Sequence, residues 1–226
     1  MPEIFSPALF TNETRDEMKK AEKRGDESSN TKAQILKDDL NYIGEGGRVV
    51  VAATEVNPEM LVAVSMKETT PTEAKTIYYN QKLLKTLFPY NFPTIYAAWG
   101  KTEVRGVSAN FRERINGRHF TKEETQKMHI GLPVESAANP FYKVRDTFIE
   151  LDIPVVFDKN ERNYMVSDYK DEMFVDTVNY SNWTTDQKNR VLSYMQQHGY
   201  QPRDIKIAET CLNRLLVLKT SAKPNS

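Results

Sequence analysis

The pattern of apolar residues changes near residue 115, and this change does most to limit the folds open to the chain. Before that point, short apolar runs predict strands, most clearly at 49–51, 61–66 and 95–99. After it, apolar residues recur every three or four positions, which is typical of helices. The sequence therefore predicts an α+β chain with a sheet-rich first part and a mainly helical second part.

One helix is expected inside the sheet-rich part, at about 72–87. Pro71 and Glu73 are the residue types preferred in a first helical turn, and Pro89 follows the last apolar residue of the pattern. In the second part, the same kind of spacing predicts helices at 140–151, at 185–197 and from Pro202 onward.

A predicted β-hairpin carries the polar residues with the clearest chemical potential. Two short apolar strands flank a turn at 168–171, and antiparallel pairing of 163–167 with 172–176 would place Asn163 across from Asp176. Asp158 lies five residues before Asn163, at the end of an apolar run that we expect to be a short strand. Amide and carboxylate oxygens would then converge, and such oxygens are suitable ligands for Mg²⁺.

Two features of the sheet-rich part are compatible with phosphate binding. Lys67 ends an apolar strand, where its ammonium group could face a cleft and neutralise phosphate charge. Gly44, Gly46 and Gly47 precede that strand, and glycines let backbone N–H groups approach an anion closely. Taken singly, the lysine is an ordinary solvated strand end and the glycines form a tight turn.

The order of these features resembles that of the protein-kinase-like superfamily. That family has a glycine-rich loop, a strand lysine, a helix glutamate, an Asp followed five residues later by Asn, and a metal-binding Asp after a hairpin. The resemblance covers residues ~41–180 and favours the compact small-molecule or lipopolysaccharide kinases, because only 50 residues follow Asp176. It implies a two-lobed fold with a polar arm at 1–40, a nucleotide-binding lobe at 41–115 and a truncated, mainly helical lobe at 116–220.

The resemblance also implies ATP and Mg²⁺ as cofactors and a role for each residue. Asp158 would orient or deprotonate a hydroxyl of an unidentified acceptor, and Asn163 and Asp176 would hold Mg²⁺. Lys67 would hold the α- and β-phosphates with Glu73 as its acidic partner, and the glycine cluster would contact the nucleotide. The implied activity is that of an ATP- and Mg²⁺-dependent phosphotransferase.

Two segments depart from the family pattern. Val156-Phe157 stands where the family has His-Arg or His-Gly, and Asp176-Thr177-Val178 stands where it has Asp-Phe-Gly. These departures leave open a pseudokinase, in which the same fold serves as a nucleotide-binding or protein-interaction module without turnover. On their own, Asp158 and Asn163 are also ordinary turn residues.

Glu73 has an alternative role as well. It lies only six residues after Lys67 and in the first helical turn, where a carboxylate complements the helix dipole. Asn80 and Gln81 lie deeper in the same helix and could face Lys67 in its place.

Composition narrows the expected partners and compartment. The 31 basic residues balance the 31 acidic ones, which disfavours nucleic acid and membrane surfaces as partners. No apolar run approaches the roughly 18 residues of a membrane span. The single cysteine, Cys211, is predicted to be a buried thiol and allows no internal disulfide, so we expect a cytoplasmic protein. Residues 12–33 are almost wholly polar, and we expect a solvated arm outside the core.

Overall fold

The computed structural model describes residues 10–25, 28–46, 49–54, 57–102, 107–134, 137–155, 157–176 and 178–221. These residues form two compact units. Unit 1 contains the described residues up to Ala74 together with Tyr96–Arg114, and unit 2 contains Lys75–Ile95 together with the described residues from Ile115 onward. The lobe boundaries implied by the resemblance stay a prediction.

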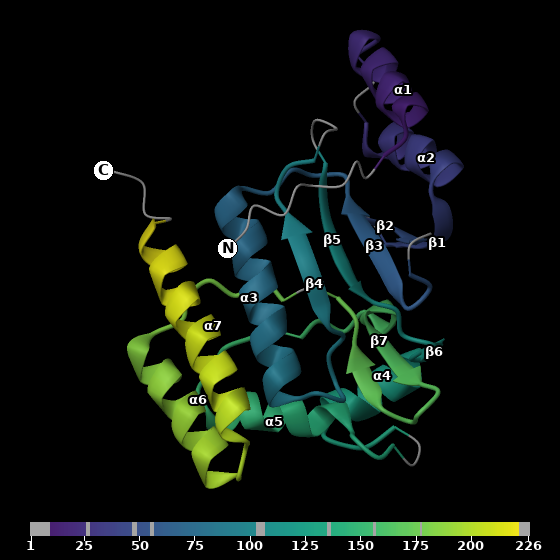
Figure 1. The fold of residues 1–226 in the computed structure, drawn as a ribbon. Helices are drawn as coiled ribbons and strands as arrows, with labels where there is room; N and C mark the ends of the chain where they lie inside the picture. Colours follow the sequence, from purple (N-terminus) through teal and green to yellow (C-terminus); the bar gives the residue numbers. More distant parts are fainter. Residues whose placement is uncertain are drawn as a thin grey trace. The chain divides into compact units, whose positions relative to one another are not determined.

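Unit 1 is built on a five-stranded sheet in the order β1-β2-β3-β5-β4 (Figure 1). Its strands are β1 (Asn41–Gly46), β2 (Val49–Ala53), β3 (Met60–Ser65), β4 (Ile95–Trp99) and β5 (Ser108–Glu113). The pairs β1–β2, β2–β3 and β3–β5 are antiparallel. The buried side chains of β2, Val50 and Ala52, alternate with more exposed ones, as in a strand that packs one face on a core. The strands predicted from the apolar runs are therefore confirmed.

Two helices precede this sheet, α1 (Asn12–Lys23) and α2 (Ser29–Asp39). The expectation that residues 12–33 stay outside the core is wrong, because Met18 and Ala21 are buried. They lie three positions apart and so share one face of α1, while the polar remainder faces water. Leu36 of α2 is 0% exposed and joins the same core, and α2 contacts β1 and β2 (Figure 1).

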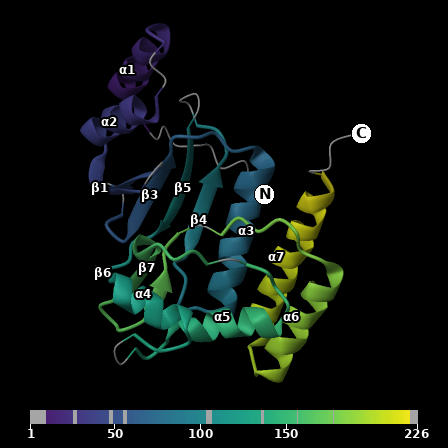
Figure 2. The same cartoon turned by 180° about the vertical axis from the view of Figure 1, so that it is seen from behind.

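Unit 2 is mainly helical. Helix α3 (Pro71–Leu87) begins in unit 1 and continues into unit 2. The other elements of unit 2 are β6 (Gly117–His119), α4 (Lys122–His129), α5 (Phe141–Glu150), the 3-10 helix η1 (Glu161–Asn163), β7 (Tyr164–Ser167), β8 (Glu172–Phe174), α6 (Thr185–Gln197) and α7 (Pro202–Ser221). Helices α6 and α7 lie side by side (Figure 2).

The predicted helices α3, α5, α6 and α7 are confirmed, whereas α4 was not predicted. Helix α4 has a single large apolar residue, Met128, so its sequence has no helical apolar pattern. A capping box, in which Thr121 and Glu124 bond to each other's backbone N–H, marks its start instead.

The predicted hairpin is present as β7–β8, but its register differs by one residue from the prediction. Tyr164 pairs with Phe174, and the backbone N–H of Val175 donates to the carbonyl of Asn163 at 2.8 Å. Asn163 therefore lies across from Val175 rather than Asp176. The predicted strand at 155–157 is also wrong for Val155 and Phe157, which lie in irregular backbone; Val156 is outside the described residues.

Aromatic side chains fill the core of unit 2 beneath these segments. Phe157 packs edge-on against Phe141 and Phe174, with ring centroids 5.0 and 5.2 Å away. Tyr164 packs on Phe120 and Phe174 at 5.5 and 5.2 Å. Edge-to-face and stacked pairs of this kind add to the stabilisation from burial, so the cluster fixes the chain on both sides of the 3-10 helix.

The predicted α+β class is confirmed by the sheet-rich unit 1 and the helical unit 2 with its hairpin. The thiol of Cys211 is buried in α7, as expected, and burial raises its pKa to about 11. Among the described residues, no helix has both the length and the apolar composition needed to cross a membrane.

Leu36→Ala tests whether the N-terminal helices belong to the core. Because Leu36 is fully buried, we expect the free energy of unfolding to fall by about 2–5 kcal/mol. Denaturant unfolding of the purified chain measures this change. Gln34→Ala, an exposed position on the same helix, is the control and should change the value by less than about 0.5 kcal/mol. Equal values for both variants would place α2 outside the core.

Candidate functional site

Asp158 extends into solvent from the irregular segment that follows buried Phe157. Its Oδ1 accepts hydrogen bonds from the backbone N–H of Asn160 at 3.1 Å and from Nδ2 of Asn163 at 2.9 Å. Its carbonyl oxygen accepts a hydrogen bond from the hydroxyl of Tyr164 at 2.6 Å. The carboxylate is thus oriented through one oxygen, and Oδ2 is left available for another partner.

Asn163 ends the 3-10 helix and begins the hairpin. Asn160 caps that helix, and the N–H of Asn163 donates to the Asn160 carbonyl at 3.0 Å. Because Nδ2 of Asn163 donates to Asp158, the oxygen of the same amide points away from that carboxylate. The structure therefore brings Asn163 and Asp158 into direct contact, as expected from their spacing of five.

Asp176 is the first exposed carboxylate after β8. Burial raises the pKa of the Tyr164 hydroxyl strongly, and the negative charges of Asp158 and Asp176 raise it further. The backbone N–H of Val175 donates to the carbonyl of Asn163 at 2.8 Å, and Asp176 is the next residue. The hairpin thus brings the backbone at Asp176 near the Asp158–Asn163 pair, although its register differs from the predicted one.

The donor atoms of this group fit a magnesium ion. The set contains the amide oxygen of Asn163 and the carboxylate of Asp176, and Mg²⁺ prefers one or two carboxylates together with phosphate oxygens and water. In the described part of the chain, no group of three or more His, Cys, Asp or Glu side chains forms a metal site by itself.

Lys67 and the glycines belong to unit 1. Lys67 lies two residues beyond β3, its side chain is exposed, and its carbonyl accepts a hydrogen bond from the hydroxyl of Ser108 at 2.8 Å. Gly44 and Gly46 lie in β1, opposite Val51 and Val49, while Gly47 is outside the described residues. A side chain added at Gly44 would meet open space, so the backbone at this position is accessible to a ligand.

Glu73 caps helix α3. Its carboxylate accepts a hydrogen bond from the N–H of Thr70 at 2.6 Å, while the N–H of Glu73 donates to the Thr70 hydroxyl at 3.1 Å. This reciprocal pair is a capping box. No ion pair joins Lys67 to Glu73 among the described residues. The pairing implied by the resemblance stays a prediction, and helix capping is the role that the structure gives to Glu73.

Asn80 and Gln81, the alternative partners for Lys67, bond within unit 2. Asn80 donates to the carbonyl of Tyr180 and accepts from Nε1 of Trp183, both at 2.9 Å. Gln81 donates to the carbonyl of Asp176 at 2.9 Å. Both side chains therefore contact the segment that begins at Asp176.

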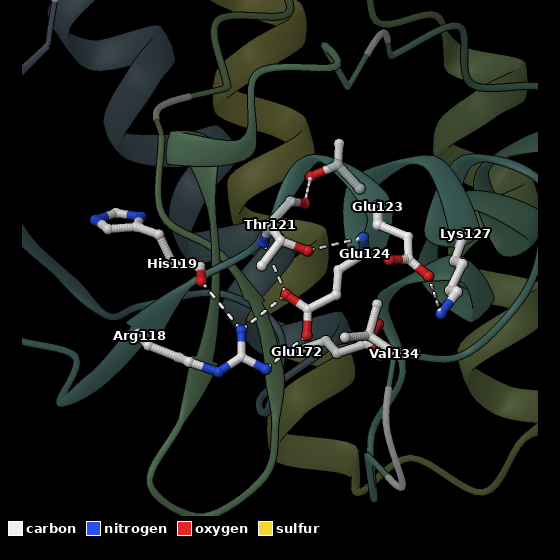
Figure 3. Close-up of polar contacts among 9 residues, drawn as sticks. Arg118, His119, Thr121, Glu123, Glu124, Lys127, Val134 and Glu172 are labelled. Carbon is white, nitrogen blue, oxygen red and sulfur yellow. Dashed lines mark hydrogen bonds and ion pairs between the residues drawn. The ribbon is translucent and has the colours of Figure 1, made fainter.

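Glu172 is a residue that the sequence analysis missed. It lies on β8, is 0% exposed, and accepts hydrogen bonds at 2.7 Å from the N–H groups of Val134 and Phe141 (Figure 3 shows Val134). Burial raises the pKa of its carboxyl, and the two backbone donors oppose that rise. Phe141 opens α5, whose preceding residue Pro140 offers no side-chain cap, so Glu172 caps this helix from a distant strand.

An ion pair lies next to Glu172 on the α4 side (Figure 3). Arg118 of β6 contacts both carboxylate oxygens of Glu124, at 2.5 and 2.7 Å. The guanidinium holds the pKa of Glu124 below its usual range, with the Thr121 N–H adding to this effect. The pair joins β6, and through it the β7–β8 hairpin, to α4.

Comparison with known proteins gives structural neighbours only. No family model matches the chain, and no curated protein matches it. Aminoglycoside phosphotransferase APH(4)-Ia is 11% identical, with a TM-score of 0.33 over 86% of this chain and 99% of that one. The bifunctional kinase-methyltransferase WbdD is 12% identical, with a TM-score of 0.31 over 77% of this chain and 42% of that one.

A variant of aminoglycoside 2'-phosphotransferase IIIa in complex with GDP is 10% identical, with a TM-score of 0.31 over 80% of this chain and 85% of that one. Likeness at this level assigns no activity and no residue roles. The element order β1–β2–β3–α3–β4–β5, followed by helices and the β7–β8 hairpin, agrees with the order of features on which the resemblance rests.

Glu172→Ala should destabilise the hairpin that carries Asp176. The N–H groups of Val134 and Phe141 would be left buried and unpaired, at about 1–3 kcal/mol each. We expect the free energy of unfolding to fall by that summed amount in a denaturant titration. Glu150→Ala, at the exposed far end of α5, is the control. A Glu172→Ala variant as stable as this control would contradict the capping role.

Proposed function

We propose that the chain is an ATP- and Mg²⁺-dependent phosphotransferase that acts on a hydroxyl acceptor. The observation that carries this proposal is the grouping of three polar residues. Nδ2 of Asn163 donates to Asp158 at 2.9 Å, and the carbonyl of Asn163 accepts a hydrogen bond at 2.8 Å from the N–H of Val175, the residue before Asp176. Phosphoryl transfer needs mainly positioning and charge neutralisation, so a short list of such groups is sufficient.

In this proposal Asp158 is the catalytic residue that receives the acceptor. Two hydrogen bonds to its Oδ1 fix the carboxylate, so Oδ2 is the oxygen that would accept the hydroxyl proton. The acceptor oxygen would bond to the γ-phosphorus of ATP as the bond from that phosphorus to the ADP oxygen breaks and ADP leaves. Asn163 and Asp176 would hold Mg²⁺, which when bound offsets the negative charge of the phosphate oxygens.

Lys67, Gly44 and Gly46 are the proposed nucleotide-binding residues of unit 1. The exposed ammonium of Lys67 would bind the α- and β-phosphates, and the backbone near Gly44 would lie against the nucleotide. Gly47 extends the same cluster. Glu73, whose Oε2 accepts the hydrogen bond from Thr70, would join this group through its other carboxylate oxygen.

Phe157 supports a site that needs no activating phosphate. In place of a family arginine, it holds the segment before Asp158 by packing among Phe92, Phe141, Phe148 and Phe174. Apolar packing does not depend on a phosphorylated partner.

The second candidate is a pseudokinase that binds nucleotide or a protein without turnover. The capping role of Glu73 favours it, because the carboxylate implied as the partner of Lys67 is already bonded elsewhere. The loss of the family residues at 156–157 and 177–178 points the same way.

Asp176→Ala tests the metal site. Ligand binding stabilises the folded chain by about 2.7 kcal/mol at a hundredfold excess over Kd, so the parent should show a clear thermal shift with ATP and Mg²⁺. The variant should lose this shift and remain folded, since Asp176 is exposed. Asp168→Ala, an exposed carboxylate in the turn of the same hairpin, should keep it. A shift retained by Asp176→Ala would show that Asp176 does not hold the metal.

Asp158→Asn separates the enzyme from the pseudokinase. The change preserves shape and removes the proton acceptor, so turnover should fall by about 10²–10⁴-fold while MgATP affinity stays nearly constant. Phosphate transfer to a panel of hydroxyl acceptors and to water measures turnover, and Asp152→Asn, an exposed carboxylate at the start of the same segment, is the control. If the parent binds MgATP but transfers phosphate to nothing, the pseudokinase replaces the enzyme as the conclusion.

A further inference from the structure

Two adjacent amide side chains of α3 are bonded to the segment that follows β8. Gln81 donates through Nε2 to the carbonyl of Asp176, and Asn80 donates through Nδ2 to the carbonyl of Tyr180, both at 2.9 Å. Asn80 also accepts a hydrogen bond from Nε1 of Trp183 at 2.9 Å. One turn of α3 thus contacts this segment at its first residue and at two positions further on; Thr177 is outside the described residues.

The far end of the segment is held independently. The ammonium of Lys219, on α7, donates to the carbonyl of Trp183 at 3.2 Å. Thr184 then caps α6 through a capping box with Gln187. These contacts involve α6 and α7 rather than α3, so they would hold residues 183–187 in place if the Gln81 bond were lost. Loss of that bond would therefore act mainly on Asp176.

Gln81 is buried at 3% exposure, yet only one end of its amide is bonded. Its Oε1 has no hydrogen-bond partner among the described residues. A carbonyl oxygen only accepts, so the amide must present its nitrogen to Asp176, which leaves the oxygen unpaired. A buried, unpaired acceptor is destabilising, and an apolar side chain of the same length would pack there without that cost.

We propose that Gln81 is a positioning residue for Asp176, with Asn80 holding the rest of the segment against α3. The inference rests on the proposed function, in which Asp176 binds Mg²⁺. The Gln81 amide fixes the Asp176 carbonyl, and Val175, the preceding residue, is bonded to Asn163 at 2.8 Å. With both sides of the Asp176 backbone fixed, this residue is held next to the Val175–Asn163 contact before any ligand binds.

Gln81→Met tests this inference, since methionine matches the length of glutamine and removes both polar atoms. The loss of one hydrogen bond and the loss of one unpaired acceptor oppose each other, so the midpoint of denaturant unfolding should change little. Outer partners of metal ligands typically contribute about 10–100-fold to metal affinity. We therefore expect the apparent Kd for Mg²⁺ at fixed ATP to rise by that factor, with ATP binding in the absence of Mg²⁺ unchanged.

Hydrogen–deuterium exchange of residues 175–183 gives a readout that needs no ligand. Exchange there should quicken in Gln81→Met and stay at the parent rate in the control Gln196→Met, an exposed glutamine of α6. Parent-like exchange and parent-like Mg²⁺ affinity in Gln81→Met would overturn the inference. So would a large fall in stability with equal losses of Mg²⁺ and Mg²⁺-free ATP binding, which marks a structural role.

The two proposals can fail separately. If the parent binds no MgATP, the proposed function fails, and the exchange measurement alone decides whether Gln81 fixes Asp176. If the parent binds MgATP and both Gln81→Met readouts match it, the proposed function stands and the positioning role is withdrawn.

Discussion

Burial of aromatic side chains in unit 2 fixes the directions of the polar residues beside them. Asp158 follows Phe157, Asn163 precedes Tyr164, and both aromatic residues are buried. Packing these two aromatic rings in the core fixes the backbone next to Asp158, which is exposed, and next to Asn163, which is partly exposed. The same short segments therefore supply side chains to the apolar core and to the candidate site, so a change in core packing would also move the site residues.

Buried polar side chains also link the β7–β8 hairpin to the neighbouring backbone. Glu172 joins β8 to the start of α5, because its carboxylate accepts a hydrogen bond from the N–H of Phe141, the first residue of that helix. Asn91 adds a similar link, since its Nδ2 donates to the carbonyls of Asn139 and Glu172 at 2.8 and 2.7 Å. Such links cost desolvation and are favourable only when every partner is present, which makes the hairpin a cooperative element.

The segment that begins at Asp176 departs from the family sequence pattern described above. The family glycine is absent, and the segment is bonded to α3 and α7 by Asn80, Gln81 and Lys219. The proposed metal ligand is thus held by contacts within the folded chain. A phosphotransferase built this way would be active without a prior modification, and a pseudokinase built this way would keep a fixed surface for a partner.

The sequence by itself determined the elements whose signals are local. Helical spacing and terminal prolines predicted α3, α5, α6 and α7, and apolar runs predicted β2, β3, β4 and the β7–β8 hairpin. The interval of five between Asp158 and Asn163 was enough to bring them into contact, because few residues separate them. The grouping of Asp176 with Asp158 and Asn163 as one site stays a prediction.

Only the tertiary structure decided the features that depend on distant residues. The register of the hairpin, the burial of Met18 and Leu36, and the capping of α5 by Glu172 arise from contacts between segments far apart in the chain. No local pattern encodes such contacts, since each depends on which surfaces meet after the elements have formed. The same reason applies to the hydrogen bond from Gln81 to the carbonyl of Asp176, which lies 95 positions along the chain.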